Sequence, residues 1–73
     1  MTILVTGAPG WLGTRLVESL IKEGKKVRCL VLPGLNTEPL VKLGAEIIYG
    51  DVTKKETLLG ACEGVVSIIH AAG

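Results

Sequence analysis

Apolar residues along this chain occur in two alternating patterns, short uninterrupted runs and longer segments with helical spacing. Four short runs rich in Val, Ile and Leu predict buried β-strands, over residues 2–6, 26–32, 45–50 and 65–70. Between the first two strands, apolar positions recur along one helical face, at Leu12, Leu16, Val17, Leu20 and Ile21. This face predicts a helix over residues 11–23, which Gly24 is placed to end.

Two shorter helices are predicted between the remaining strands. One covers residues 38–43, with a proline tolerated in its first turn and Gly44 as its stop. The other begins at a capping box formed by Thr53 and Glu56 and ends at Gly64. The resulting order is β-α-β-α-β-α-β, and strands joined by such crossover helices run parallel.

This order of elements predicts an α/β fold, the amino-terminal half of a doubly wound parallel sheet. A four-stranded parallel sheet leaves two edges unpaired and one face incompletely covered. The chain also stops at the end of a strand, where another crossover would begin. We therefore expect residues 1–73 to be a partial domain, a fragment of a longer protein, and we expect it to form a homo-oligomer.

The glycine-rich segment TGAPGWLG, residues 6–13, lies where the first strand meets the first helix. Gly7 can take the positive φ that a sharp exit from the strand requires. Gly10 lets a pyrophosphate approach the backbone, and Gly13 lets the helix lie against the neighbouring strand. Unpaired N–H groups at the helix start form an anion site. The pattern favours a phosphate-binding loop, with a plain strand–turn–helix joint as the alternative.

The spacing of the glycines separates this segment from related loops. A P-loop requires a Gly-Lys pair after four intervening residues, but the fifth residue after Gly7 is Leu12 and no lysine is near. The Gly-x-Gly-x-x-Gly fingerprint of ordinary dinucleotide domains is not matched either. The segment therefore belongs to a different class of loop.

Composition and charge narrow the function classes. The 73 residues allow one small core, and an apolar content of 48% with a single Trp and a single Tyr makes that core aliphatic. A net charge of +1 without a basic run predicts no nucleic-acid partner. No apolar stretch approaches the roughly 20 residues that cross a bilayer, and no secretory signal is present, so we predict no membrane partner. Cys29 and Cys62 are interpreted as reduced thiols of a cytoplasmic protein, with a disulfide as the alternative.

The glycine segment also carries a family pattern. Thr-Gly-x-x-Gly-aromatic-aliphatic-Gly is matched at Thr6, Gly7, Gly10, Trp11, Leu12 and Gly13. On this pattern the chain resembles the extended short-chain dehydrogenase/reductases, which include nucleotide-sugar epimerases and dehydratases and dihydroflavonol reductase-like proteins. The resemblance implies a Rossmann-type domain that binds NAD or NADP. It further implies that the backbone amides of Trp11 and Leu12 hold the cofactor pyrophosphate.

Two later segments extend the resemblance. GDVT resembles the Gly-Asp-aliphatic-Thr/Ser unit that ends the third strand in this family. It implies that Asp51 binds the adenine amino group and that the Val52 backbone lies beside the ring, although Asp51 could instead only start the next helix. HAAG resembles the family element at the end of the fourth strand and implies that Ala71 and Ala72 lie against the cofactor ribose. His70 is interpreted as a structural histidine rather than a catalyst.

The catalytic Tyr-x-x-x-Lys pair of this family is absent. The only tyrosine, Tyr49, lies on the third predicted strand and is followed four residues later by Thr53. We therefore predict no catalytic residue and no metal ligand in this chain, and substrate binding through a carboxyl-terminal part. No acidic residue ends the second strand to bind the ribose 2′-hydroxyl of NAD. This slightly favours NADP, although Leu32 occupies the position of the arginine in NADP users.

Three functions are compatible with these features. The favoured one is the NAD(P)-binding portion of an oxidoreductase, epimerase or dehydratase that transfers hydride at a sugar-nucleotide or a carbonyl/hydroxyl substrate. The alternative is a non-enzymatic regulator that senses NAD(P) with the same half-domain. A third possibility is a structural fragment without ligand affinity of its own.

Overall fold

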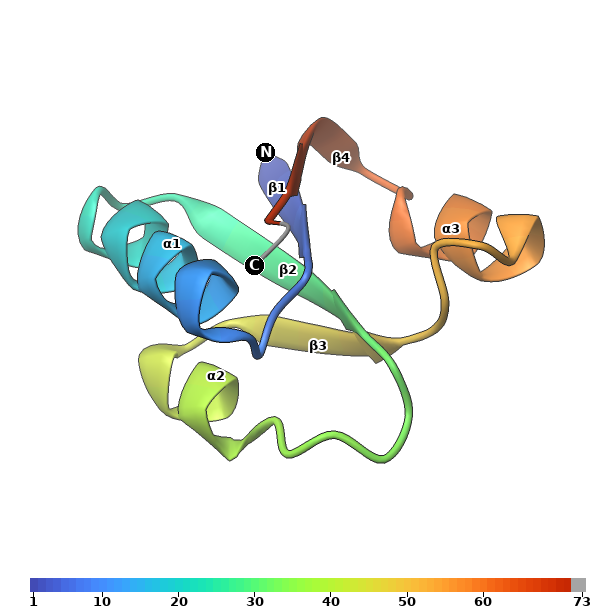
Figure 1. Cartoon of the computed structure of the whole chain (residues 1–73). Coiled ribbons are helices and arrows are strands. Elements are labelled where there is room, and N and C mark those ends of the chain that lie inside the picture. The colour runs from blue at the N-terminus through green and yellow to red at the C-terminus, as the bar shows by residue number, and fades with distance from the viewer. Residues whose placement is uncertain (72–73) are drawn as a thin grey trace.

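A four-stranded parallel sheet in the order β3-β2-β1-β4 organises the chain in the computed structural model, which describes residues 1–71 (Figure 1). Its elements are β1 (Thr2–Thr6), α1 (Trp11–Lys22), β2 (Lys26–Val31), α2 (Glu38–Leu43), β3 (Glu46–Tyr49), α3 (Lys55–Ala61) and β4 (Val65–His70). The strand order reverses between β1 and β4, because the chain first builds outward and then returns past its starting strand. The fold is thus the predicted α/β arrangement, one half of a Rossmann-type sheet.

The periodicity located most elements to within a residue or two. The bounds of β1, α2 and β4 are those predicted, and Gly24 follows the end of α1 with a φ of +82°. The prediction of a capping box is wrong, because α3 begins two residues after Thr53 and has no side-chain cap. The Thr53 hydroxyl instead donates to Asp51 Oδ1 over 2.7 Å. This local hydrogen bond competes with capping of the helix by Thr53.

Two apolar clusters lie on opposite faces of the sheet. The larger is covered by α1 and α2 and contains the buried residues Val5, Ala8, Val17, Val27, Cys29, Val31 and Leu40. The smaller joins Leu4 and Leu30 of the sheet to Ala61 of α3. Figure 1 shows α3 standing to one side of the sheet, and on that side Val66 and Ile68 of β4 are exposed. The larger cluster therefore carries most of the packing.

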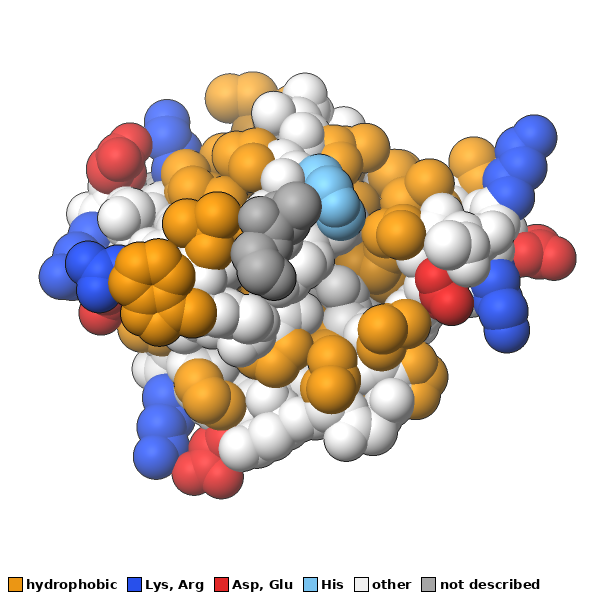
Figure 2. Space-filling view, viewed as in Figure 1, with side chains coloured by type: hydrophobic (Ala, Val, Ile, Leu, Met, Phe, Trp, Pro, Cys, Tyr) orange, Lys and Arg blue, Asp and Glu red, His pale blue; other side chains and the backbone are white. Residues whose placement is uncertain are grey.

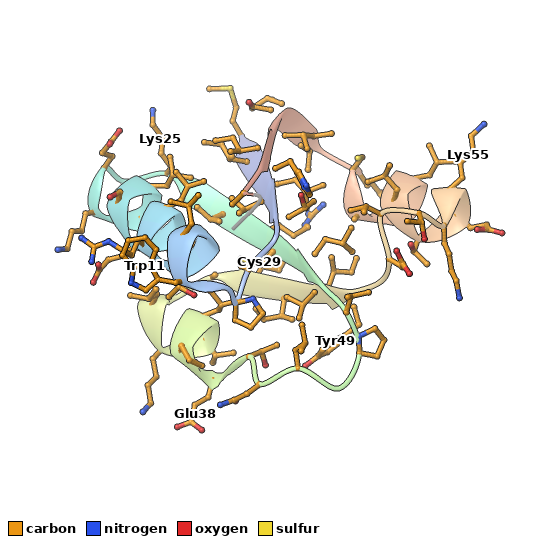
Figure 3. All side chains as sticks on the ribbon, in the orientation of Figure 1. Trp11, Lys25, Cys29, Glu38, Tyr49 and Lys55 are labelled. Carbon is orange, nitrogen blue, oxygen red and sulfur yellow. The ribbon has the colours of Figure 1, made fainter. Side chains whose placement is uncertain are left out.

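On one face of the molecule, charged side chains surround an apolar area. Figure 2 shows hydrophobic side chains gathered across the middle of the face on which the carboxyl ends of the strands open, with Lys, Arg, Asp and Glu around them. In Figure 3, Trp11 lies on the outer side of α1 whereas Cys29 lies inside, between the sheet and the helices. Within residues 1–71, no helix has the length and apolar character to cross a membrane.

Both cysteines are free thiols, as predicted. Cys29 is in the larger cluster and Cys62 packs against the smaller one, so the sheet separates them. Burial raises the pKa of the Cys29 thiol from 9.0 to about 11. Between these values the unfolded chain releases the thiol proton while the native chain keeps it, so stability falls as pH rises through this window.

We expect the free energy of unfolding to fall by about 2–3 kcal/mol between pH 9 and pH 11 because of Cys29. Urea denaturation across this range measures the loss. The variant Cys29→Ala, although less stable at neutral pH, should lack this part of the pH dependence. The same slope in both proteins would contradict the assignment to Cys29.

Candidate functional site

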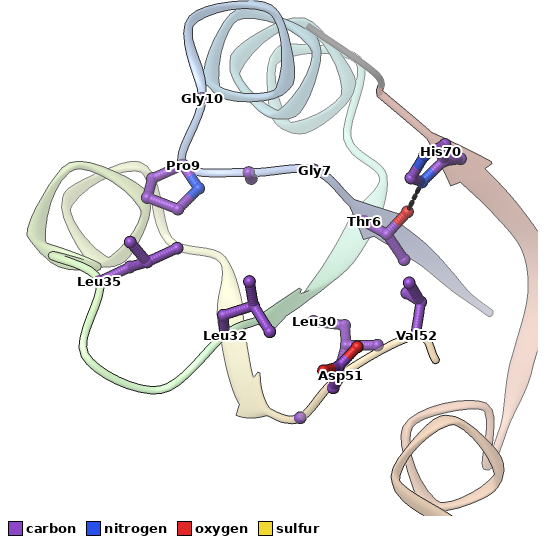
Figure 4. Close-up of a pocket in the computed structure, with 12 residues that line it drawn as sticks. Thr6, Gly7, Pro9, Gly10, Leu30, Leu32, Leu35, Asp51, Val52 and His70 are labelled. Atoms are coloured by element: carbon purple, nitrogen blue, oxygen red, sulfur yellow. Dashed lines mark hydrogen bonds between the residues drawn. The ribbon is translucent and has the colours of Figure 1, made fainter. Parts of the chain in front are cut away.

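A cavity of about 490 Å³ opens at the carboxyl ends of the strands (Figure 4). Its lining comes from the loop after β1, the end of β2 with the loop beyond it, the turn after β3, and the last residue of β4, His70. In open α/β sheets, ligands bind in this crevice, next to the point where the strand order reverses. Of the predicted site residues, Gly7, Gly10, Asp51 and Val52 meet in this cavity.

Gly7 closes the cavity against the end of β4. Its φ is +92°, the left-handed region in which side chains are strained. A Cβ at this position would lie 1.8 Å from the carbonyl oxygen of Ala71, whose own N–H donates to Thr6 O over 2.8 Å. The position thus requires glycine for two reasons, the backbone angle and the close approach of β4. Only the first of these was predicted.

The other two glycines of the loop make it compact. The Gly10 N–H donates to Gly7 O over 3.2 Å, and a Cβ on Gly10 would lie 2.9 Å from that oxygen. A Cβ on Gly13 would lie 2.9 Å from the Cα and N atoms of Ala8. The first turn of α1 therefore lies against the loop that leaves β1. The expectation that Gly13 serves contact with a neighbouring strand is corrected accordingly.

The start of α1 presents unpaired backbone donors at the edge of this loop. Gly10 is the residue before the helix and provides no side-chain cap. Within the described chain, the N–H groups of Trp11, Leu12 and Gly13 have no protein acceptor, and the ladder begins with Thr14 N donating to Gly10 O over 2.9 Å. Such amides, together with the helix dipole, favour an anion.

Asp51 supplies the ionised carboxylate in the lining. Its Oδ1 accepts from the Thr53 N–H over 2.9 Å and from the Thr53 hydroxyl, and these bonds, with a smaller effect of Lys54, lower its pKa. The Thr57 hydroxyl donates to Asp51 O over 2.7 Å and accepts from Asp51 N over 3.0 Å. Asp51 therefore shapes the turn before α3 and also faces the cavity, so the two interpretations of this residue are compatible.

The remaining predicted residues lie beside the cavity or beyond the described chain. Ala71 is buried against β1 next to Gly7, and Ala72 lies outside the described residues. His70 lines the cavity with its Nδ1 hydrogen-bonded to the hydroxyl of buried Thr6, a bond between β4 and β1 that agrees with a structural role.

Sequence reasoning named Leu32 only as the position of an arginine in NADP users, and it did not predict that apolar residues line the cavity. These residues are Ala8 and Pro9 of the glycine loop, Leu30 at the end of β2, and Leu32 and Leu35 beyond it. The rule that placed Asp51 at a strand end also applies to Leu32, so that signal was present. Leu35 depends on the path of the loop between β2 and α2, which has no periodicity to read.

This chain is similar to known proteins along nearly its whole length. The model of the 3-beta hydroxysteroid dehydrogenase/isomerase family matches residues 4–73. Photosystem II assembly factor Ycf39 of Cyanophora paradoxa is 45% identical over 72 residues, and Sterol demethylase protein B of Methylococcus capsulatus is 40% identical. Each alignment covers 99% of this chain and 22% of the relative. The solved UDP-glucose 4-epimerase of Thermotoga maritima is 26% identical, with a TM-score of 0.82 over 100% of this chain and 24% of its own.

Proposed function

This chain belongs to the 3-beta hydroxysteroid dehydrogenase/isomerase family, and on that basis we propose that it is the NAD(P)-binding part of an oxidoreductase or epimerase. The family match and the solved epimerase also confirm the resemblance to the extended short-chain dehydrogenase/reductases. The chain spans about a fifth of the length of the curated relatives. The activity of the whole protein is accordingly part of the proposal.

The observation that carries the proposal is the set of unpaired amides at the start of α1, next to a loop with no room for a Cβ at Gly7, Gly10 or Gly13. The N–H groups of Trp11 and Leu12 are free to bind the pyrophosphate. At the far side of the cavity, the Asp51 carboxylate keeps Oδ2 without a protein partner among the described residues. It is therefore able to accept from the adenine amino group, with Val52 beside the ring. Ala71 and Ala72 complete the proposed site on the ribose.

The bound nicotinamide would carry the hydride, and the substrate would be a sugar-nucleotide or a molecule with a carbonyl or hydroxyl group. This chain binds and orients the cofactor, and we assign none of its residues to catalysis. Tyr49 supports that division, because its side chain is exposed on β3 and its hydroxyl lies 3.4 Å from Thr37 Oγ1. The substrate would be bound by a carboxyl-terminal part. We further propose a homo-oligomer in a cytoplasmic setting, which suits the two free thiols.

A second candidate is a regulator that binds NAD(P) without turning over a substrate. It is favoured by one comparison, since the relative at 45% identity is named as an assembly factor. The same site serves both functions. Oxidation of NAD(P)H by added carbonyl compounds or sugar-nucleotides, measured on the protein that includes the proposed carboxyl-terminal part, distinguishes the enzyme from the sensor.

Binding itself can be measured through the single tryptophan of the chain. Trp11 is the first residue of α1, adjacent to the proposed pyrophosphate site, and is exposed. We expect NADH or NADPH to quench its fluorescence saturably by energy transfer, with matching heat in calorimetric titration. Trp11→Phe should lose the optical signal and keep the heat. The absence of both signals with NADH and with NADPH would refute the proposed function and leave the chain as a scaffold.

A further inference from the structure

The cavity has an apolar end formed by Leu32 and Leu35, just beyond β2 (Figure 4). Leu32 follows the last residue of the strand and remains 50% exposed at the rim. In Rossmann-type sheets the end of this strand distinguishes the two nicotinamide dinucleotides, because an acidic residue there binds a ribose 2′-hydroxyl and an arginine accommodates a 2′-phosphate. An aliphatic side chain can do neither.

The cations close to this position in the sequence are engaged or lie elsewhere. Arg28 donates to the carboxylate of Glu46 on β3 and to carbonyl oxygens at the end of α3. Arg15 lies over the ring of Trp11, 5.3 Å from its centroid, on α1. Lys25 and Lys26 stand at the amino end of β2, the edge of the sheet opposite the cavity. Within the described chain, no lysine or arginine lines the cavity.

The acidic residue of the lining does not replace a strand-end acid. Asp51 follows β3 rather than β2, and its Oδ1 accepts from the backbone and hydroxyl of Thr53. At its adenosine ribose end, the proposed site therefore has neither an acidic residue at the end of β2 nor a cation in its lining.

We propose that Leu32 makes this a site for both dinucleotides, which binds NAD(H) and NADP(H) with affinities within about tenfold of each other. The 2′ position of the ribose meets aliphatic side chains and solvent, so a hydroxyl and a phosphate are accommodated alike. This inference rests on the proposed function, and it replaces the slight preference for NADP that the sequence predicted.

The test compares the dissociation constants of NADH and NADPH for the unaltered protein, Leu32→Arg and Leu32→Asp, by calorimetry and Trp11 fluorescence. We expect a ratio within about tenfold for the unaltered protein. Leu32→Arg should shift the ratio at least about tenfold toward NADPH, and Leu32→Asp should shift it toward NADH.

Val41→Arg is the matched control. Val41 is 55% exposed, lies on α2 and does not line the cavity, so a cation there should leave the ratio unchanged. An equal shift in Val41→Arg, no shift in Leu32→Arg, or a preference above tenfold in the unaltered protein would each overturn the role of Leu32. Failure of both dinucleotides to bind is a different result, because it removes the proposed function and this inference with it.

Discussion

Replacing Gly7 with alanine is expected to lower the free energy of unfolding by more than about 3 kcal/mol and to abolish dinucleotide binding. The φ of +92° costs any residue with a Cβ about 1–2 kcal/mol. The larger cost comes from the Cβ itself, which would stand 1.8 Å from Ala71 O. The end of β4 has to move away from β1 to relieve that overlap, so the sheet and the cavity change together.

Gly44→Ala separates the two costs. Gly44 ends α2 with a φ of +94°, but a Cβ there would meet nothing within 4 Å among the described residues. It should therefore lose only the conformational part, about 1–2 kcal/mol, and keep dinucleotide affinity. Urea denaturation followed by circular dichroism gives both values. If the two variants lost equal stability, the close approach of Gly7 to Ala71 would not be a feature of the folded protein.

Gly7 also shows how far the sequence predicted the fold and the site. Its place between an apolar run and a helical pattern predicted the positive φ, since the chain has to turn there. The contact with Ala71 depends on β4 pairing with β1, a long-range arrangement that local pattern does not specify. The helices and strands, in contrast, were predicted well, because apolar periodicity is a local property that burial on a sheet or helix imposes.

The errors in the sequence prediction have local causes of another kind. Thr53 and Glu56 had the spacing of a capping box, but Asp51 competes for the Thr53 hydroxyl, and sequence spacing does not rank two polar partners. Leu35 reaches the cavity through the loop after β2, where no repeating pattern fixes the backbone. The sequence places Leu32 where a residue that binds the ribose 2′ group is expected. Whether a cation from elsewhere replaces that residue depends on the folded arrangement, and no lysine or arginine of the described chain lines the cavity.

Arg28→Met is the second substitution with a large expected effect. The Arg28 side chain is only 15% exposed, and its Nη1 donates to the carbonyl oxygens of Ala61 and Glu63, each over 2.7 Å. A cation at the carbonyl end of a helix satisfies acceptors that have no partner within the helix. It also interacts favourably with the negative end of the helix dipole. Since the apolar cluster beneath α3 is small, Arg28 is a principal link between this helix and the sheet.

We expect Arg28→Met to lower the free energy of unfolding by about 2–4 kcal/mol, because methionine keeps the apolar stem but loses the charged hydrogen bonds. Relative to the unaltered protein, the variant should show faster hydrogen exchange of the α3 amides, with a smaller change in the α1 amides. Dinucleotide affinity should also fall, since Asp51 and Val52 lie in the turn that leads into α3 and depend on its position.

Glu46→Gln tests whether the ion pair or the helix contact accounts for this effect. Arg28 Nε also donates to Glu46 Oε1 over 3.0 Å, but that carboxylate is 49% exposed, so the pair contributes less than about 1 kcal/mol. Arg28→Lys should give an intermediate loss, because a lysine keeps the charge but cannot span the acceptors on both β3 and α3. A loss in Glu46→Gln as large as that in Arg28→Met would mean that α3 is held by its apolar contacts alone, and that Arg28 acts within the sheet.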